Sequence, residues 1–201
     1  MMKLLCIGDS NTYGYDPQSY YGGRYPDGIR WVSLIDGWEV SDCGMNGLTI
    51  PSDSKVWQNL IVSKHPDLVS VMLGTNDLLG GCTAEIVTNR MESFLKSLNE
   101  TGIPILLIAP PVLKHGAWVP YDSQIEESRK LGRLYQSIAE RMNLLFADAG
   151  EWKIGLGFDG VHFTEDGHRV FAAELSRYLN ETGSECCFRK TTKSHQKQVS
   201  G

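Results

Sequence analysis

The feature that most constrains the fold is a regular alternation of short apolar runs with longer segments of helical periodicity. Residues 4–7 and 68–73 contain no charged side chain, which is typical of strands buried on both faces. Strands that alternate with helices favour a parallel sheet covered by helices on both sides. We predict strands at 4–7, 38–40, 68–73, 105–109 and 144–147, and helices near 53–64, 83–100, 123–142 and 165–180.

The composition is that of one soluble globular domain. The 201 residues are 41% hydrophobic and 21% charged, and a chain of this length can bury most of its apolar surface. A net charge of −5 without a basic stripe gives no indication of a nucleic-acid or membrane partner. We predict one domain over 1–180 and a polar, disordered tail over 181–201.

The cysteines and the first residues bear on the cellular compartment. The five cysteines are odd in number and lack the spacing of a zinc site or a C-x-x-C redox motif. Only three residues precede the first apolar run, which leaves no room for a secretory signal, and no apolar stretch approaches the roughly 20 residues of a membrane span. We therefore expect a cytoplasmic protein with reduced thiols.

A serine stands where the first predicted strand ends. The small and polar residues 8–12 follow strand 4–7, and Ser10 lies at their centre. At a strand-to-helix junction, backbone N–H groups point outward beside the side chain. Ser10 is therefore a candidate nucleophile whose own N–H helps to hold an oxyanion. The alternative is that Ser10 only caps the next segment, as serine often does.

A histidine and an aspartate stand three residues apart near the other end of the chain, just before the last predicted helix. A carboxylate at Asp159 can accept a hydrogen bond from one ring nitrogen of His162 across a single turn. That bond fixes the tautomer and leaves the other nitrogen as a base. The alternative is a surface histidine beside a capping aspartate.

Two further loops follow predicted strands. Asn76 comes directly after strand 68–73 and could donate its amide N–H to a developing negative charge, or it could simply close an Asx turn. Gly44 follows strand 38–40, and its N–H can approach a substrate closely because it has no side chain; otherwise it is an ordinary turn glycine. Because parallel strands end at a common edge, these loops and Ser10 are expected to form one site.

In their order and spacing, these segments resemble the four sequence blocks of the SGNH, or GDSL-type, hydrolase family. The resemblance implies a three-layer α/β/α sandwich around a five-stranded parallel sheet, flavodoxin-like in topology, with no metal or organic cofactor. It implies Ser10 as the nucleophile, His162 as the general base and Asp159 as the residue that orients it. It further implies an oxyanion hole formed by the N–H groups of Ser10 and Gly44 and by the side chain of Asn76.

The resemblance is strongest to the arylesterase and acyltransferase-like branch, in which a tyrosine-rich stretch follows the serine block. It implies a serine esterase for short acyl chains, acetyl foremost, with a small-molecule ester as its partner. A carbohydrate O-acetyl esterase and a non-catalytic, flavodoxin-like binding module are the alternatives. The loop 13–31 is also a candidate contact with a second copy of the chain. Candidate pocket residues are Asp9, Tyr13, Tyr15, Trp31 and Trp118, with Tyr20, Tyr21 and Tyr25 as further wall residues.

Overall fold

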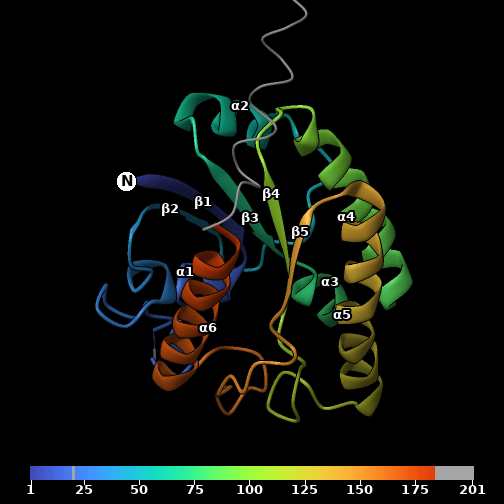
Figure 1. Cartoon of the computed structure of the whole chain (residues 1–201). Helices are drawn as coiled ribbons and strands as arrows, with labels where there is room; N and C mark the ends of the chain where they lie inside the picture. The colour runs from blue at the N-terminus through green and yellow to red at the C-terminus, as the bar shows by residue number, and fades with distance from the viewer. Residues whose placement is uncertain (20, 184–201) are drawn as a thin grey trace, which may run out of the picture.

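Five parallel strands form one sheet, as the alternation predicts (Figure 1). The computed structural model describes residues 1–19 and 21–183; Tyr20 and residues 184–201, which make up most of the predicted tail, lie outside the described residues. The strand order β2-β1-β3-β4-β5 is the flavodoxin-like order, so the predicted fold class is confirmed. The strands are β1 (Met2–Gly8), β2 (Trp38–Gly44), β3 (Leu68–Met72), β4 (Ile105–Ala109) and β5 (Leu145–Asp148).

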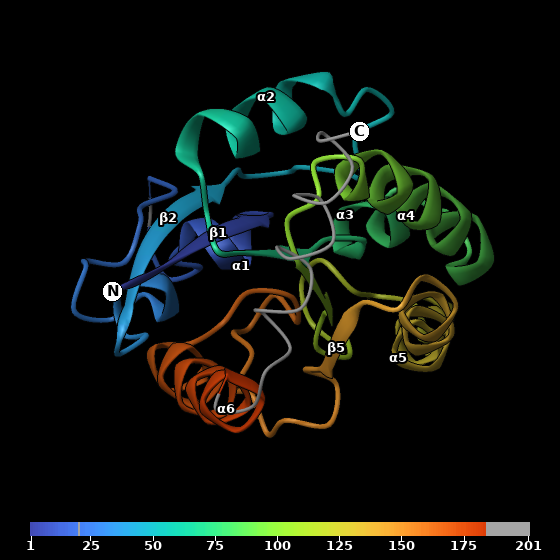
Figure 2. The same ribbon diagram turned by 45° about the horizontal axis from the view of Figure 1, so that its top comes forward.

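Helices cover both faces of the sheet (Figure 2). On β3, Val69 and Val71 belong to one hydrophobic core, and Leu68 and Met72 belong to the other. Both faces of the strand are therefore buried, which explains its uninterrupted apolar sequence. One core is covered by α2 (Lys55–Lys64), α4 (Ala84–Asn99) and α5 (Asp122–Met142), and the other by the short 3₁₀ helix η1 (Trp31–Ser33) and by α6 (Glu165–Gly183).

The register of the central strands brings three loops to one edge. Gly8, the last residue of β1, pairs with Gly44 on β2 and with Met72 on β3, so the three strands end level with one another. The segments that leave this edge are the short helix α1 (Ser10–Tyr13), the loop 45–54 and the short helix α3 (Thr75–Leu79). The sheet thus delivers the chain segments of the candidate site to a common place.

The observed elements differ from the prediction mainly at their ends. The four predicted helices are present, and each begins and ends within three residues of its predicted bounds. Helix α6 continues to Gly183, three residues beyond the predicted domain boundary. Strand β2 is longer than predicted because it continues through Ser41 and Asp42, whose polar side chains are tolerated on a half-buried edge strand. Helix α3 was not predicted.

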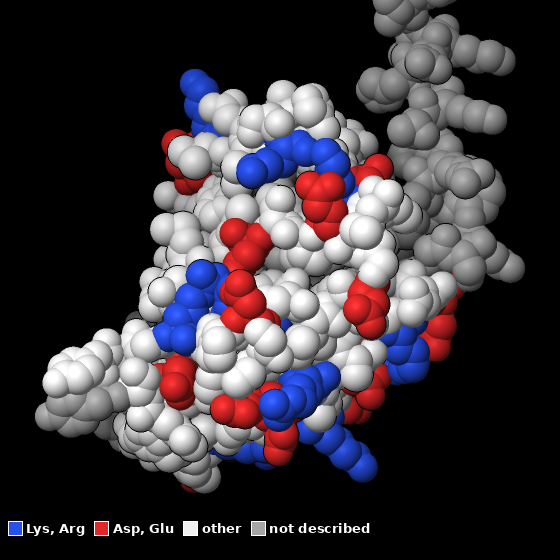
Figure 3. Space-filling view, turned by 90° about the vertical axis from the view of Figure 1, so that its left-hand side faces the viewer, with Lys and Arg blue, Asp and Glu red and all other residues white. Residues whose placement is uncertain are grey.

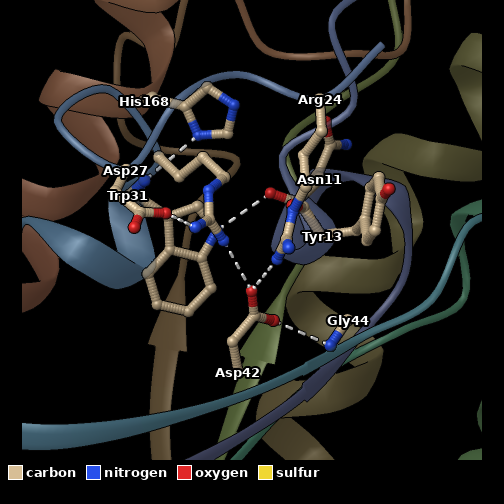
Figure 4. A network of polar contacts seen from close by, with 9 residues as sticks. Asn11, Tyr13, Arg24, Asp27, Trp31, Asp42, Gly44 and His168 are labelled. Atoms are coloured by element: carbon tan, nitrogen blue, oxygen red, sulfur yellow. Dashed lines mark hydrogen bonds and ion pairs between the residues drawn. The ribbon is translucent and has the colours of Figure 1, made fainter. Parts of the chain in front are cut away.

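Ion pairs fix the loop 13–31 to the edge strand β2 (Figure 4). Asp42 on β2 pairs with both Arg24 and Arg30, and its Oδ2 lies 3.0 Å from Arg30 Nη1. Arg24 also donates from Nε to the carbonyl of Tyr13 at 2.6 Å.

Figure 3 views the side of the molecule that is on the left in Figure 1, and on this face acidic and basic side chains are interspersed.

The end of this loop is held by the core rather than by the site. Trp31, predicted as a pocket residue, is only 1% exposed; its ring centroid lies 4.7 Å from that of Phe171, and its Nε1 donates to the Asn11 carbonyl at 2.9 Å. The prediction for Trp31 is therefore wrong, because the indole anchors the loop beneath the sheet edge. His168 is fully buried and accepts from the Trp31 N–H through Nδ1 at 3.4 Å.

A buried tyrosine supports the turn after β3, and this generates a stability prediction. The Tyr135 hydroxyl donates to the Leu73 carbonyl at 3.1 Å, and the side chain is fully buried. Tyr135→Phe leaves that carbonyl without its partner, so we expect a loss of about 1–3 kcal/mol in the free energy of unfolding. Urea unfolding measures it, with Tyr13→Phe as the control. Equal stability of the two variants would contradict the prediction.

Candidate active site

The turn after β1 presents Ser10 at the sheet edge. Asp9 caps α1, because its Oδ1 accepts the Asn11 N–H at 3.0 Å and the helix begins at Ser10. The serine is mostly buried, but 6% of its surface remains exposed to solvent. As the first residue of a helix, Ser10 has an N–H without an intrahelical acceptor. The turn therefore offers a hydroxyl and a backbone donor together.

Ser10, His162 and Asp159 form one hydrogen-bonded row. His162 Nε2 lies 2.9 Å from Ser10 Oγ, and His162 Nδ1 lies 2.7 Å from Asp159 Oδ2. The other carboxylate oxygen, Asp159 Oδ1, accepts the N–H groups of Val161 at 2.9 Å and His162 at 3.0 Å. The histidine and the aspartate are both almost completely buried. The three groups predicted from distant parts of the sequence are thus brought into contact.

The electrostatics of this row favour an ionised carboxylate. Burial raises the pKa of Asp159, but the hydrogen bonds from the His162 ring and from the N–H groups of His162 and Val161 outweigh it and lower the pKa below its usual value. An ionised Asp159 can only accept, so it holds the proton of the ring on Nδ1. Nε2 is then free to accept the hydroxyl proton of Ser10. This arrangement can activate an alcohol as a nucleophile.

The turn that carries the histidine depends on a close approach of two loops. Gly160 has a φ of +81°, and a Cβ there would lie 2.0 Å from the Lys114 carbonyl oxygen. Only glycine meets both conditions without displacing the backbone. The Trp118 N–H donates to the Asp159 carbonyl at 3.1 Å, so the loop after β4 is joined to the same turn.

Asn11 is a structural partner of the site that the sequence analysis missed. Its Nδ2 donates to the Val161 carbonyl at 3.1 Å, and its Oδ1 accepts the Phe163 N–H at 2.9 Å. These two residues flank His162, so one amide side chain holds the histidine turn against the serine turn. The signal in the sequence was an Asn directly after the serine, since an amide can donate and accept at once.

The backbone donor predicted at Gly44 is occupied. The Gly44 N–H donates to Asp42 Oδ1 at 2.9 Å, and a Cβ on this glycine would lie 2.1 Å from the Tyr13 nitrogen. Gly44 therefore permits the end of β2 to pack closely on α1, and its N–H does not face a substrate. The prediction that it contributes to an oxyanion hole is wrong for this reason.

A second glycine, three residues further on, has the free donor. The Leu48 N–H donates to the Met45 carbonyl at 3.2 Å, which closes a turn with Gly47 at φ +71°. Among the residues that the structure describes, no hydrogen bond engages the Gly47 N–H. The turn is bound on both sides, because Met45 N–H donates to the Gly8 carbonyl at 3.0 Å and Asn76 Nδ2 donates to the Leu48 carbonyl at 3.0 Å. The Asn-Gly pair at 46–47 was the sequence signal for this turn.

Two of the predicted aromatic residues contact the histidine. The Tyr15 ring lies 4.4 Å from the His162 ring, and the Trp118 ring lies 4.9 Å from it, edge to face at 82°. Trp118 is 50% exposed and so presents part of its indole to solvent beside the site. Tyr13 instead packs under the Arg24 guanidinium, 4.3 Å from its ring centre. Of the further wall residues, Tyr25 is buried in contact with the His168 ring and Tyr21 is 92% exposed.

Neither a metal cluster nor a membrane span is found within residues 1–19 and 21–183. No group of three or more His, Cys, Asp or Glu side chains is placed to hold a metal ion. None of the helices there combines the length and apolar character that crossing a bilayer requires.

Comparison with known proteins gives consistent matches. The model of the GDSL-like lipase/acylhydrolase family matches residues 6–170. The acetylxylan esterase of Geobacillus stearothermophilus is 26% identical over 213 residues, which cover 91% of this chain and 94% of the relative. A carbohydrate acetylesterase family member from Sinorhizobium meliloti is 26% identical, with a TM-score of 0.80 over 90% of this chain and 98% of that one. The aryl esterase of M. smegmatis is 25% identical, with a TM-score of 0.77 over 90% and 99%.

Asp9, predicted as a pocket residue, is 1% exposed and caps α1, so that prediction is wrong. Burial raises the pKa of Asp9 to about 6. The hydrogen bonds from the Asn11 N–H and Thr75 and the attraction of His162 lower the pKa, but they do not outweigh burial. A folded-state pKa above the unfolded value means that the folded protein binds the proton more readily. Ionisation therefore lowers stability as the pH rises from about 4 to 6, by up to about 3 kcal/mol for two pKa units.

Asp9→Asn keeps an oxygen acceptor but does not titrate. We expect the stability of this variant, relative to the wild type, to be higher at pH 7.5 than at pH 4.5. Urea unfolding of both proteins at the two pH values measures this difference, and any pH-independent cost of the substitution cancels. A difference that stays constant between the two pH values would contradict the raised pKa.

Proposed function

Since the chain belongs to the GDSL-like lipase/acylhydrolase family and is a carboxylic ester hydrolase, we propose that it cleaves short-chain acyl esters, acetyl esters foremost, through an acyl-enzyme on Ser10. The observation that carries this proposal is the row in which His162 lies 2.9 Å from Ser10 Oγ and 2.7 Å from Asp159 Oδ2.

In the proposed mechanism, the Ser10 oxygen attacks the ester carbonyl while its proton passes to Nε2 of His162. The imidazolium then gives that proton to the leaving alcohol, and the acyl group stays on Ser10. Water next loses a proton to His162 and attacks the acyl-enzyme, which releases the acid. Asp159 remains ionised throughout and stabilises the imidazolium that forms in each half of the reaction.

Three donors are suited to the oxyanion. The first is the N–H of Ser10 itself, and the second is the remaining amide hydrogen of Asn76, whose other one is bound to the Leu48 carbonyl. The third is the N–H of Gly47, which replaces the predicted N–H of Gly44. Gly47 lies in the turn that is bound to Gly8, two residues before the serine, and to Asn76. Such fixed donors favour a transition state in which charge develops on the carbonyl oxygen.

The leaving alcohol must lie near His162, because Nε2 protonates it. Trp118 is half exposed and contacts that ring, so an alcohol with a flat apolar face can pack on the indole. A sugar ring fits this description, and this observation favours a carbohydrate O-acetyl ester as a second candidate substrate. The similarity to an acetylxylan esterase and to a carbohydrate acetylesterase family member supports it.

Hydrolysis is tested with p-nitrophenyl esters from acetate to octanoate on the wild type and on Ser10→Ala. We expect acetate to be cleaved fastest and the variant to lose at least about 10⁴-fold in kcat, as when a serine nucleophile is removed. Ser63→Ala, an exposed serine on α2, is the matched control and should keep full activity. Turnover that survives in Ser10→Ala, or no labelling of the wild type by a fluorophosphonate, would contradict the proposal.

The role of Trp118 is tested by the KM for an acetylated xylo-oligosaccharide and for ethyl acetate. Trp118→Ala should raise the KM for the sugar ester about fivefold, since one aromatic contact contributes on the order of 1 kcal/mol, and should leave ethyl acetate almost unaffected. Tyr121→Ala, in the same loop region and 67% exposed, is the control. Equal changes for the two substrates would show that the indole does not bind the alcohol.

A further inference from the structure

A buried carboxylate next to Asn76 has no part in the catalytic row. Asp77, on α3, has a side chain with 0% exposure. Its Oδ2 accepts the Ile50 N–H at 3.0 Å, and its Oδ1 lies 2.9 Å from Nη1 of Arg90, which is half exposed on α4. Both oxygens are therefore bound, one to the loop after β2 and the other to a helix.

Asn76 and Asp77 together bind the loop after β2 at two points. Asn76 Nδ2 donates to the Leu48 carbonyl, and Asp77 accepts the Ile50 N–H two residues later. The peptide that carries the free N–H of Gly47 lies directly before these two anchors. The distance between this N–H and the Asn76 amide is thus set by two neighbouring side chains of one short helix.

The loop packs Ile50 into the core, and Leu48 packs against that core. Leu48 and Ile50 also border a cavity of about 1020 Å³ that lies between α2 and α4, and Arg90 lines the same cavity. The hydrogen bonds from α3 add to this packing in fixing the position of the loop. The Arg90 guanidinium lies beside the buried carboxylate of Asp77 and forms an ion pair with it.

We propose that Asp77 is a positioning residue for the oxyanion hole, with Arg90 as its counter-ion. Asp77 holds the loop 45–50 at the distance from Asn76 at which the Gly47 N–H and the Asn76 amide can both reach the oxyanion. This positioning stabilises the transition state more than the bound substrate, because the donors bind the negative oxygen more strongly than the neutral carbonyl. The inference rests on the proposed function, because it presumes hydrolysis at Ser10.

The first test is kcat and KM for p-nitrophenyl acetate. Asp77→Ala should lower kcat about 10- to 100-fold with less than about a twofold change in KM, as expected when oxyanion donors are misplaced. Asp77→Asn, which keeps one acceptor for Ile50, should recover part of this loss. Asp53→Asn, an exposed aspartate in the same loop, is the matched control and should match the wild type.

A double-mutant cycle separates positioning from a general loss of structure. Asn76→Ala alone should cost about 10²–10³ in kcat. If Asp77 acts through the same oxyanion hole, the double variant should be no more than about threefold slower than Asn76→Ala, because the effects are not additive. The affinity for a trifluoromethyl ketone, which forms an oxyanion on Ser10, should fall in Asp77→Ala by about the same factor as kcat.

Arg90→Met is the variant to measure if Asp77→Ala does not fold. It leaves Asp77 and Ile50 in place but removes the counter-ion of a buried carboxylate. Because Arg90 is half exposed, water can partly replace its hydrogen bond, so we expect a folded variant with a lowered melting temperature and about a threefold lower kcat.

The inference would be overturned if the losses in kcat of Asp77→Ala and Asn76→Ala multiplied in the double variant. It would also be overturned if Asp77→Ala and Arg90→Met both kept the wild-type kcat. Either result would leave the proposed function intact. No Ser10-dependent turnover in the wild type would overturn both.

Discussion

The contact between His162 Nε2 and Ser10 Oγ joins two segments that are 152 residues apart, and the rest of the site depends on it. The parallel sheet brings the two segments to one edge, but it does not fix them to within a hydrogen bond. That precision comes from Asn11, which binds the backbone on both sides of the histidine, and from Asp159, which accepts two N–H groups of its own turn. The hydrogen-bonded row of Ser10, His162 and Asp159 is therefore held mainly by side chain to backbone bonds within a buried region.

The fold could be predicted from the sequence because local pattern and one rule of topology determine it, whereas the candidate reacting groups were indicated by their place beside strand ends and by the family resemblance. Apolar runs and helical periods gave the order of strands and helices, and parallel strands share one edge for their carboxyl ends. Ser10, Asn76 and the Asp159–His162 pair stand in segments that follow a strand or precede the last helix, so the topology predicts them near one edge of the sheet. Tyr15 and Trp118, predicted as pocket residues, contact the His162 ring.

The failures have two causes, a competing local hydrogen bond and a packing partner distant in the sequence. Gly44 looked like a free backbone donor, but the carboxylate of Asp42, two residues earlier, accepts its N–H in the manner of an Asx turn. Trp31 belongs to an aromatic segment near the serine, yet its ring fills the core against Phe171 on the last helix. Asp9 is adjacent to the nucleophile, and its buried carboxylate caps a helix instead of contacting a substrate.

The two halves of the site are stabilised in different ways, and this affects how Asn76 is understood. The serine–histidine half is enclosed by buried side chains, whereas the loop that carries Gly47 borders an open cavity and is bound by Asn76 and Asp77. In the proposed mechanism, Asn76 uses one amide hydrogen for the oxyanion and one for the loop. Its removal then deletes one donor and loosens a second, so the expected loss of activity exceeds the contribution of its own hydrogen bond to the oxyanion. Asp77 binds the loop through Ile50 and α4 through Arg90, and it offers no donor to the oxyanion, so its replacement tests the second of these effects separately.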